Sequence, residues 1–183
     1  MQLKVKTIIV TTLLLFTTSN AYSFSLKNTA FYVVGEKYGI DPLLLYSMSL
    51  ELSARYIGKG HVSPSPYAIR SHHLTKHFDS QESAGEKLRE LVKKTDWIEV
   101  GLMQISLHYH PQENPIHLLD PFQNLIVAAQ ILNKATATTN DPILGVGKYF
   151  AWSNKELAQK KGEKVWSTYS RLRALQFENI NEN

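Results

Sequence analysis

The stretch "DPLLLYSMSLELSARY", residues 41–56, carries one carboxylate inside a segment that is otherwise almost wholly apolar. Asp41 followed by Pro42 is typical of a helix start, because aspartate caps free backbone N–H groups and proline suits the first helical position. The leucines and the methionine that follow occupy nearly every side of the predicted helix, which indicates a buried helix. Glu51 shares a face with Met48 and Leu44, so its carboxylate is expected among core residues.

Two interpretations of Glu51 follow from this position. A buried charge without a partner is costly, so such a carboxylate either finds water or a cation, or holds a proton. In the first case Glu51 is a solvated or salt-bridged residue, and in the second it is a functional acid. The residues around Glu51 are compatible with both.

The first 21 residues have the pattern of a secretory signal peptide. Lys4 and Lys6 form a short basic region, an apolar run follows, and Ala21 ends a group of small residues that suits cleavage. The apolar run is too short for a comfortable membrane span. We expect an exported, periplasmic protein without a stable membrane span after cleavage, with a single domain over residues 22–183. An uncleaved membrane anchor is the alternative.

The composition of the predicted mature chain argues against two classes of protein. Removing Lys4 and Lys6 reduces the 20 basic residues to 18 against 16 acidic ones, so the net charge falls from +4 to +2. This charge is too small to favour nucleic acid as a partner. The chain has no cysteine, which excludes disulfides and thiolate chemistry and, for an exported protein, favours a bacterial periplasm.

Helix signals recur along the chain, and one short segment alternates weakly. We expect helices at residues 30–38, from Asp41 through Glu51, at 79–94 with an Asp79–Glu82 capping box, from Asp120, from Asp141 through Trp152, and at 164–177. Residues 58–66 hold two glycines and two prolines and are predicted to form a loop. Residues 66–78 are predicted to form a hairpin that turns near residues 71–73. The pattern predicts an α+β fold, mainly α, with one small β-hairpin.

Few acids in this chain are placed for acid–base chemistry. Glycoside cleavage needs a carboxylic acid that is protonated near neutral pH beside the leaving oxygen. Glu51 is the one acid in a strongly apolar helix, and Glu99, just before "VGLMQIS", is its competitor. Ten further acids are expected at helix caps (Asp41, Asp120, Asp141), on a solvated helix face (Glu82, Glu86, Glu90) or in polar C-terminal sequence (Glu156, Glu163, Glu178, Glu182).

Four blocks occur in order along the chain: "GIDPLLLYSMSLE", "VGLMQIS", "LLDPFQNLIVAAQIL" and "GVGKYF". In this order they resemble the lytic transglycosylases of the soluble type, which share the lysozyme-like fold. The resemblance covers roughly residues 36–155. A Pro-aromatic hairpin at residues 65–67 and the pair Tyr109-His110 are similar to a branch of this family found with bacterial conjugation and type IV secretion machinery.

The resemblance implies a reaction on peptidoglycan glycan strands that uses Glu51 as its catalytic acid. Glu51 would protonate the oxygen leaving MurNAc in its β-1,4 link to GlcNAc, and then accept the proton of the C6 hydroxyl as that oxygen closes onto C1. The product would be a 1,6-anhydroMurNAc end, formed without water, metal or cofactor. Conjugation or type IV secretion components are the protein partners that the resemblance implies.

The resemblance also implies four substrate-binding residues, each with a plainer alternative. Gln104 would offer its amide to a sugar N-acetyl or hydroxyl group, and Met103, with Leu102, would line the groove or pack in the core. Asn124 matches the family's asparagine after Asp-Pro, or makes a helix-end hydrogen bond. Tyr149 matches a tyrosine thought to bond near the catalytic acid, or is a core aromatic.

Two departures from the family pattern leave rival functions open. Leu52 stands where the family has serine, and Ser53, one residue later, points about 100° away on a helix. Phe150 and Trp152 replace an asparagine and a glycine. These changes favour a non-catalytic glycan-binding or assembly subunit as one rival. The other rival, a hydrolytic muramidase, needs a second carboxylate, for which Glu99 is the candidate.

Two pairs of closely spaced histidines raise the question of a metal site, but their spacing does not favour one. His73 and His77 would lie about 13 Å apart along one strand, too far to share a metal. His108 and His110 could share a face, but no third ligand is evident. We therefore expect a surface-histidine cluster and no metal.

Overall fold

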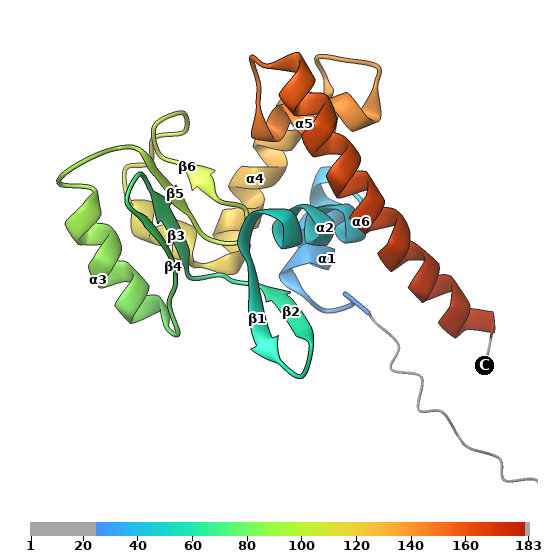
Figure 1. Ribbon diagram of the computed structural model, residues 1–183, viewed down its shortest axis with the longest axis horizontal. Helices are drawn as coiled ribbons and strands as arrows, with labels where there is room; N and C mark the ends of the chain where they lie inside the picture. Colours follow the sequence, from blue (N-terminus) through green and yellow to red (C-terminus); the bar gives the residue numbers. More distant parts are fainter. Residues whose placement is uncertain (1–24, 182–183) are drawn as a thin grey trace, which may run out of the picture.

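The computed structural model describes residues 25–181, with side chains through residue 176, as an α+β fold that is mainly α (Figure 1). The predicted signal peptide, residues 1–21, and the predicted mature start at Tyr22 lie outside the described residues. Within the part of the chain that is described, no helix has the length and apolar character needed to cross a membrane. The four-stranded sheet within residues 68–106 and helix α3 (Gln81–Leu91) lie at the left of Figure 1, and helix α6 (Lys155–Asn181) lies at the right.

Aspartate–proline pairs start three of the helices, as the sequence predicts. The side chains of Asp41, Asp120 and Asp141 each accept a hydrogen bond from a backbone N–H of the first turn. The predicted helix at residues 30–38 is confirmed and ends at Gly39. The helices are α1 (Ala30–Tyr38), α2 (Pro42–Ser53), α3 (Gln81–Leu91), α4 (Pro121–Thr136), α5 (Pro142–Phe150) and α6 (Lys155–Asn181), with a 3-10 helix η1 (Pro115–Leu119).

Several predicted helix boundaries were wrong. Ser80, not Asp79, caps α3, because Asp79 instead forms an ion pair with Arg55 at 2.6 Å. Helix α3 ends at Leu91 rather than near residue 94, and α5 ends at Phe150 rather than Trp152. Helix α6 begins at Lys155 rather than near residue 164, since the Asn154 side chain accepts a hydrogen bond from the Leu157 N–H at 2.9 Å and so supplies an earlier cap.

The β structure is more extensive than the sequence predicts. The predicted hairpin is confirmed as β3 (Ala68–Ser71) and β4 (Leu74–His77). The predicted loop at residues 58–66 was wrong, because β1 (Ala54–Gly58) and β2 (His61–Pro64) pair there, and its glycines form the turn of a second hairpin. Two further short strands, β5 (Ile98–Val100) and β6 (Ile105–Ser106), extend the first hairpin into a sheet of order β4-β3-β5-β6.

A continuous core joins the helices to the sheet. Helix α2 contributes Leu45 and Met48, the sheet contributes Ile69 and Ile98, and α4 contributes Leu125, all almost fully buried. Helix α6 packs along α2 on the opposite side from the sheet (Figure 1). The C-terminal end of α2, which carries Glu51, therefore lies where the helical part of the molecule meets the sheet.

Candidate active site

A cavity of about 260 Å³ opens at the junction of the helices and the sheet. Its walls come from α2, β3, β5, α5 and α6, together with the turn that precedes β6. Of the predicted site residues, Glu51, Gln104 and Tyr149 line it, and so does the competing acid Glu99. Segments that are far apart in sequence thus bring two carboxylates into one cavity.

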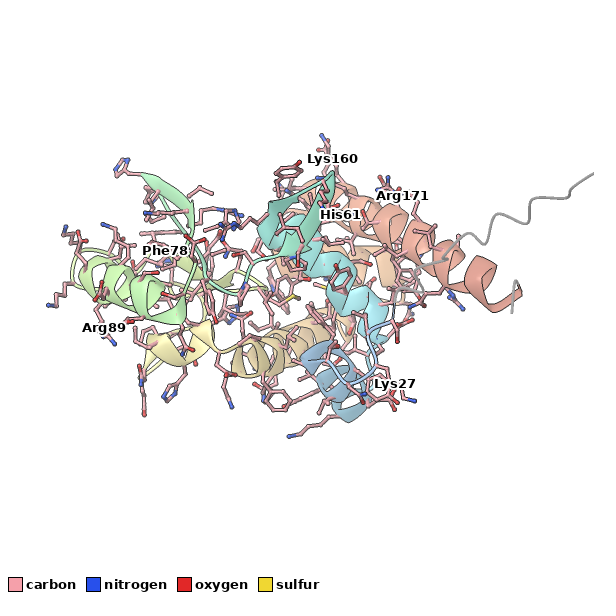
Figure 2. All side chains as sticks on the ribbon, turned by 90° about the horizontal axis from the view of Figure 1, so that it is seen from below. Lys27, His61, Phe78, Arg89, Lys160 and Arg171 are labelled. Atoms are coloured by element: carbon pink, nitrogen blue, oxygen red, sulfur yellow. The ribbon has the colours of Figure 1, made fainter. Side chains whose placement is uncertain are left out.

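Glu51 is a largely buried, ion-paired residue. Its side chain is 14% exposed, and the Lys164 ammonium of α6 lies 2.6 Å from its Oε2 atom. The Thr168 hydroxyl donates a hydrogen bond to Oε1 at 3.0 Å. The idea of an unpartnered buried carboxylate was wrong, and the salt-bridged alternative is the arrangement observed. Lys160 and Arg171, labelled in Figure 2, lie on α6 before and after this pair.

Glu99 is the second carboxylate of the cavity, and it is also ion-paired. The register of β3 and β5 sets Arg70 directly opposite Glu99, and an Arg70 guanidinium nitrogen donates to a Glu99 oxygen at 2.8 Å. A second guanidinium nitrogen donates to the Leu52 carbonyl at 2.9 Å. Arg70 therefore connects the sheet to the end of α2, and it lines the cavity.

The segment Gly101–Gln104 forms a tight turn held by a buried asparagine. The Asn124 amide nitrogen donates to the carbonyls of Val100 and Leu118, both at 2.9 Å, and its oxygen accepts from the Met103 N–H at 2.8 Å. Gly101 has a φ of 80° and lies against the Asn124 amide, so a side chain at this position would be strained and would collide. Asn124 positions the turn.

Asn124 and Met103 do not contact the cavity through their side chains. Both side chains have 0% exposure, and neither lines the cavity. The prediction that they bind substrate directly is therefore corrected: Met103 packs in the core, as does Leu102, and Asn124 acts on the cavity through the backbone that it holds. The plainer alternative for Met103 and Leu102 is the one observed.

Gln104 reaches the cavity from a strained backbone position, with a φ of 46°. Its amide nitrogen donates to the carbonyls of Ala68 at 3.2 Å and Gly101 at 2.8 Å. Both amide hydrogens are therefore used within the protein. The amide oxygen is the atom of Gln104 that remains to accept a hydrogen bond from a ligand in the cavity.

Tyr149 lines the cavity from α5, but its hydroxyl does not bond to Glu51. The hydroxyl donates to the Met103 carbonyl at 2.8 Å. Burial and then the nearby charge of Glu99 raise the pKa of Tyr149 far above its ordinary value. Tyr149 is thus a neutral phenol that fixes the turn against α5 and forms one wall of the cavity.

Three residues of the site were missed by sequence reasoning. Lys164 and Thr168 contact Glu51 from a helix more than a hundred positions away in sequence, and Arg70 reaches Glu99 from another strand. No local pattern marks these residues, because the contact depends on how α6 crosses α2. Ser53 does not contact Glu51 either: it is buried and donates to the Leu102 carbonyl at 2.7 Å.

The histidines are held in different surroundings. His108 stacks on Trp97, with ring centroids 3.8 Å apart, and contacts the Asp96 carboxylate at 2.9 Å. His110 lines the cavity, and burial, followed by the charge of Lys134, lowers its pKa. Among residues 25–181 no group of three or more histidine or acidic side chains could hold a metal ion.

The cavity combines groups suited to acid–base chemistry on an uncharged polar ligand. It offers two carboxylates that each have a cation, one free amide oxygen and a neutral histidine beside a phenol wall. Comparison of the chain with protein-family models, with curated proteins and with solved structures finds no match.

Proposed function

We propose that this protein is a peptidoglycan lytic transglycosylase, a carbon–oxygen lyase that acts in the periplasm. The observation that carries the proposal is Glu51, which comes from the apolar helix α2 and faces a cavity that Gln104 and Tyr149 also line. The order of the sequence blocks, which resembles that family, supports the same conclusion. An enzyme of this type needs only one carboxylate, because the substrate supplies the nucleophile.

In the proposed reaction, Glu51 begins in its protonated form. It gives its proton to the oxygen that links MurNAc C1 to GlcNAc, the C1–O bond breaks, and positive charge grows at C1. The MurNAc C6 oxygen then bonds to C1 while its proton passes to Glu51. The products are a free GlcNAc hydroxyl and a 1,6-anhydroMurNAc end, and Glu51 is protonated again.

The ion pair with Lys164 sets a condition on this reaction, because the ammonium lies 2.6 Å from a carboxylate oxygen of Glu51. In the proposed reaction, Lys164 moves aside before the proton passes to the leaving oxygen. The Lys164 side chain is 69% exposed, so it can turn into solvent without disturbing the core. After proton transfer, Lys164 and Thr168 stabilise the carboxylate that has formed.

The cellular role that we propose is local opening of the wall for a conjugation or type IV secretion apparatus. Support comes from the resemblance of the segment at residues 65–67 and of Tyr109-His110 to the branch found with such machinery. Glycan strands are the proposed substrate, and components of the apparatus are the proposed partners.

A hydrolytic muramidase is the second candidate, and one observation favours it. Glu99 lines the same cavity as Glu51 and could serve as the second carboxylate that hydrolysis with water requires. A non-catalytic glycan-binding subunit is the third candidate. It is favoured by Leu52 and Phe150 in the cavity wall and by the ion pair at Glu51.

Mass spectrometry of the fragments released from purified peptidoglycan distinguishes the three candidates. The experiment compares the unaltered protein with Glu51→Gln and Glu99→Gln. Anhydro ends that are lost only with Glu51→Gln support the transglycosylase. Reducing ends that require both carboxylates would establish the muramidase, and binding without any fragments would establish the non-catalytic subunit.

A further inference from the structure

A second cavity adjoins the one at Glu51 and is larger, at about 460 Å³. The two cavities share five lining residues, namely Tyr109, His110, Ile131, Tyr149 and Phe150. The two cavities are therefore continuous through these residues. A ligand too long for the first cavity could extend directly into the second.

Aromatic side chains on the outer part of this second cavity are exposed. Trp152 is 54% exposed and Tyr109 is 68% exposed, and both line the cavity. Exposed aromatic side chains that gather in one cavity are typical of a ligand-binding groove. Lys148, the lysine that lines this cavity, is engaged, since its ammonium donates to the Thr138 hydroxyl at 2.7 Å.

The backbone that carries Trp152 is held rigidly. Trp152 lies in the short turn between α5 and α6, and these helices approach closely at two glycines. Gly147 packs against the Ala158 carbonyl and Gly162 against the Ile143 carbonyl, so neither position has room for a Cβ atom. The close packing of α5 against α6 limits the backbone positions open to the turn that carries Trp152, which reduces the entropy lost on binding.

The chemistry of the cavity fits a sugar ring. A pyranose has an apolar face of C–H bonds that packs on aromatic rings, and hydroxyl groups at its edge that need hydrogen-bond partners. Trp152 and Phe150 supply the apolar surface. His110, whose pKa is lowered by burial, is neutral near pH 7 and can both donate and accept at the edge.

We propose that the second cavity is a binding subsite for an N-acetylated pyranose ring of the glycan strand, with Trp152 as its stacking platform. The inference rests on the proposed function, because continuity with the cavity at Glu51 identifies the occupant. It also explains the departure at residues 150 and 152, where aromatic rings replace polar and small residues: stacking takes over from hydrogen bonding on this wall.

The test uses N-acetylchitotetraose and N-acetylchitobiose as probes, with binding followed by the indole N–H signals in NMR spectra of the mature protein. We expect the Trp152 signal to shift with the tetrasaccharide, while that of Trp166, which lines neither cavity, stays in place. Trp152→Ala should weaken tetrasaccharide binding about tenfold and disaccharide binding much less. Trp152→Phe keeps an aromatic face, so its affinity for the tetrasaccharide should lie between those of the unaltered protein and Trp152→Ala.

Tyr56→Ala is the matched control, because Tyr56 is an aromatic residue with 65% exposure outside both cavities. Its tetrasaccharide affinity should equal that of the unaltered protein. Failure of the tetrasaccharide to bind, a stationary Trp152 signal, or equal affinity in Trp152→Ala would each overturn the subsite. Binding is measured without cleavage, so the two proposals can fail separately. A shift of the Trp152 signal in a protein that releases no anhydro ends would refute the transglycosylase activity and still support the subsite.

Discussion

The helical wall and the sheet wall of the cavity each present a carboxylate paired with a cation, but the two pairs differ in mobility. Glu51 on the helical wall is 14% exposed, and its partner Lys164 is 69% exposed. Glu99 on the sheet wall is 38% exposed, and Arg70 is 42% exposed and also bonded to the Leu52 carbonyl. Lysine on a flexible stem can withdraw, whereas a guanidinium held at two points cannot. The helical wall is therefore the one where the carboxylate can separate from its cation.

The largest expected effect separates the two carboxylates by activity. Glu51→Gln removes the proton donor and should reduce release of anhydro ends by about 10²–10⁴-fold, the usual range for loss of general acid catalysis. Glu99→Gln should retain most of the activity, because the Glu99 carboxylate is engaged by the Arg70 guanidinium at 2.8 Å. Turnover of purified peptidoglycan measures the activity of both variants. An equal loss of activity in the two variants would show that both carboxylates are needed and would favour hydrolysis.

The next effect tests the turn that joins the walls. Asn124→Ala leaves three buried backbone groups without the hydrogen bonds that the Asn124 side chain makes. The free energy of unfolding, measured by chemical denaturation, should therefore fall by roughly 3 kcal/mol or more. Asn133→Ala removes one exposed bond to the Tyr38 carbonyl and should cost under about 1 kcal/mol. Equal losses in the two variants would show that the buried network is not what holds the turn.

A smaller effect concerns the mobile cation of the helical wall. Lys164→Met removes the cation that stabilises the Glu51 carboxylate formed in the proposed reaction, so release of anhydro ends should fall several-fold. The measurement is turnover of purified peptidoglycan at one fixed pH. Lys161→Met is the control, since Lys161 lines the cavity without an observed ion pair to Glu51. Unchanged turnover in Lys164→Met would contradict the proposed role of the ion pair.

The smallest effect is on stability in acid. Burial lowers the pKa of His110 below its ordinary value of 6.5, so below that pH the unfolded state binds more protons than the folded state. Its contribution to stability is complete above pH 6.5 and is lost as the pH falls through the lowered pKa. The melting temperature should therefore fall less between pH 7.5 and pH 5.5 in His110→Gln than in the unaltered protein. An identical fall in both would exclude His110 as a source of acid sensitivity.

The elements that sequence reasoning predicted well are those with local physical causes. Aspartate–proline pairs marked the starts of α2, α4 and α5, since a cap and a fixed φ act within one turn. Residues 58–66 were misread because their glycines and prolines are equally compatible with a loop and with the turn and edge of a hairpin. Strands β5 and β6 are too short to show alternation, and they exist because β3 offers them a partner.

For the site, the apolar pattern around Glu51 was sufficient to select this residue, and the segment Gly101–Gln104 was recognised as a unit from its sequence. The sequence did not show which of the predicted residues line the cavity and which support it from the core. The burial of Met103 and Asn124 depends on how α4 packs against the turn.

The starts of the helices, the apolar surroundings of Glu51 and the mainly α fold could be predicted from the sequence, because they follow from interactions over a few residues. The contacts of Lys164 and Thr168 with Glu51, and the places of Glu99 and Trp152 in the cavity walls, became known from the folded structure. Such contacts join segments far apart in the chain. Their positions are set by the packing of whole helices, which no local pattern encodes.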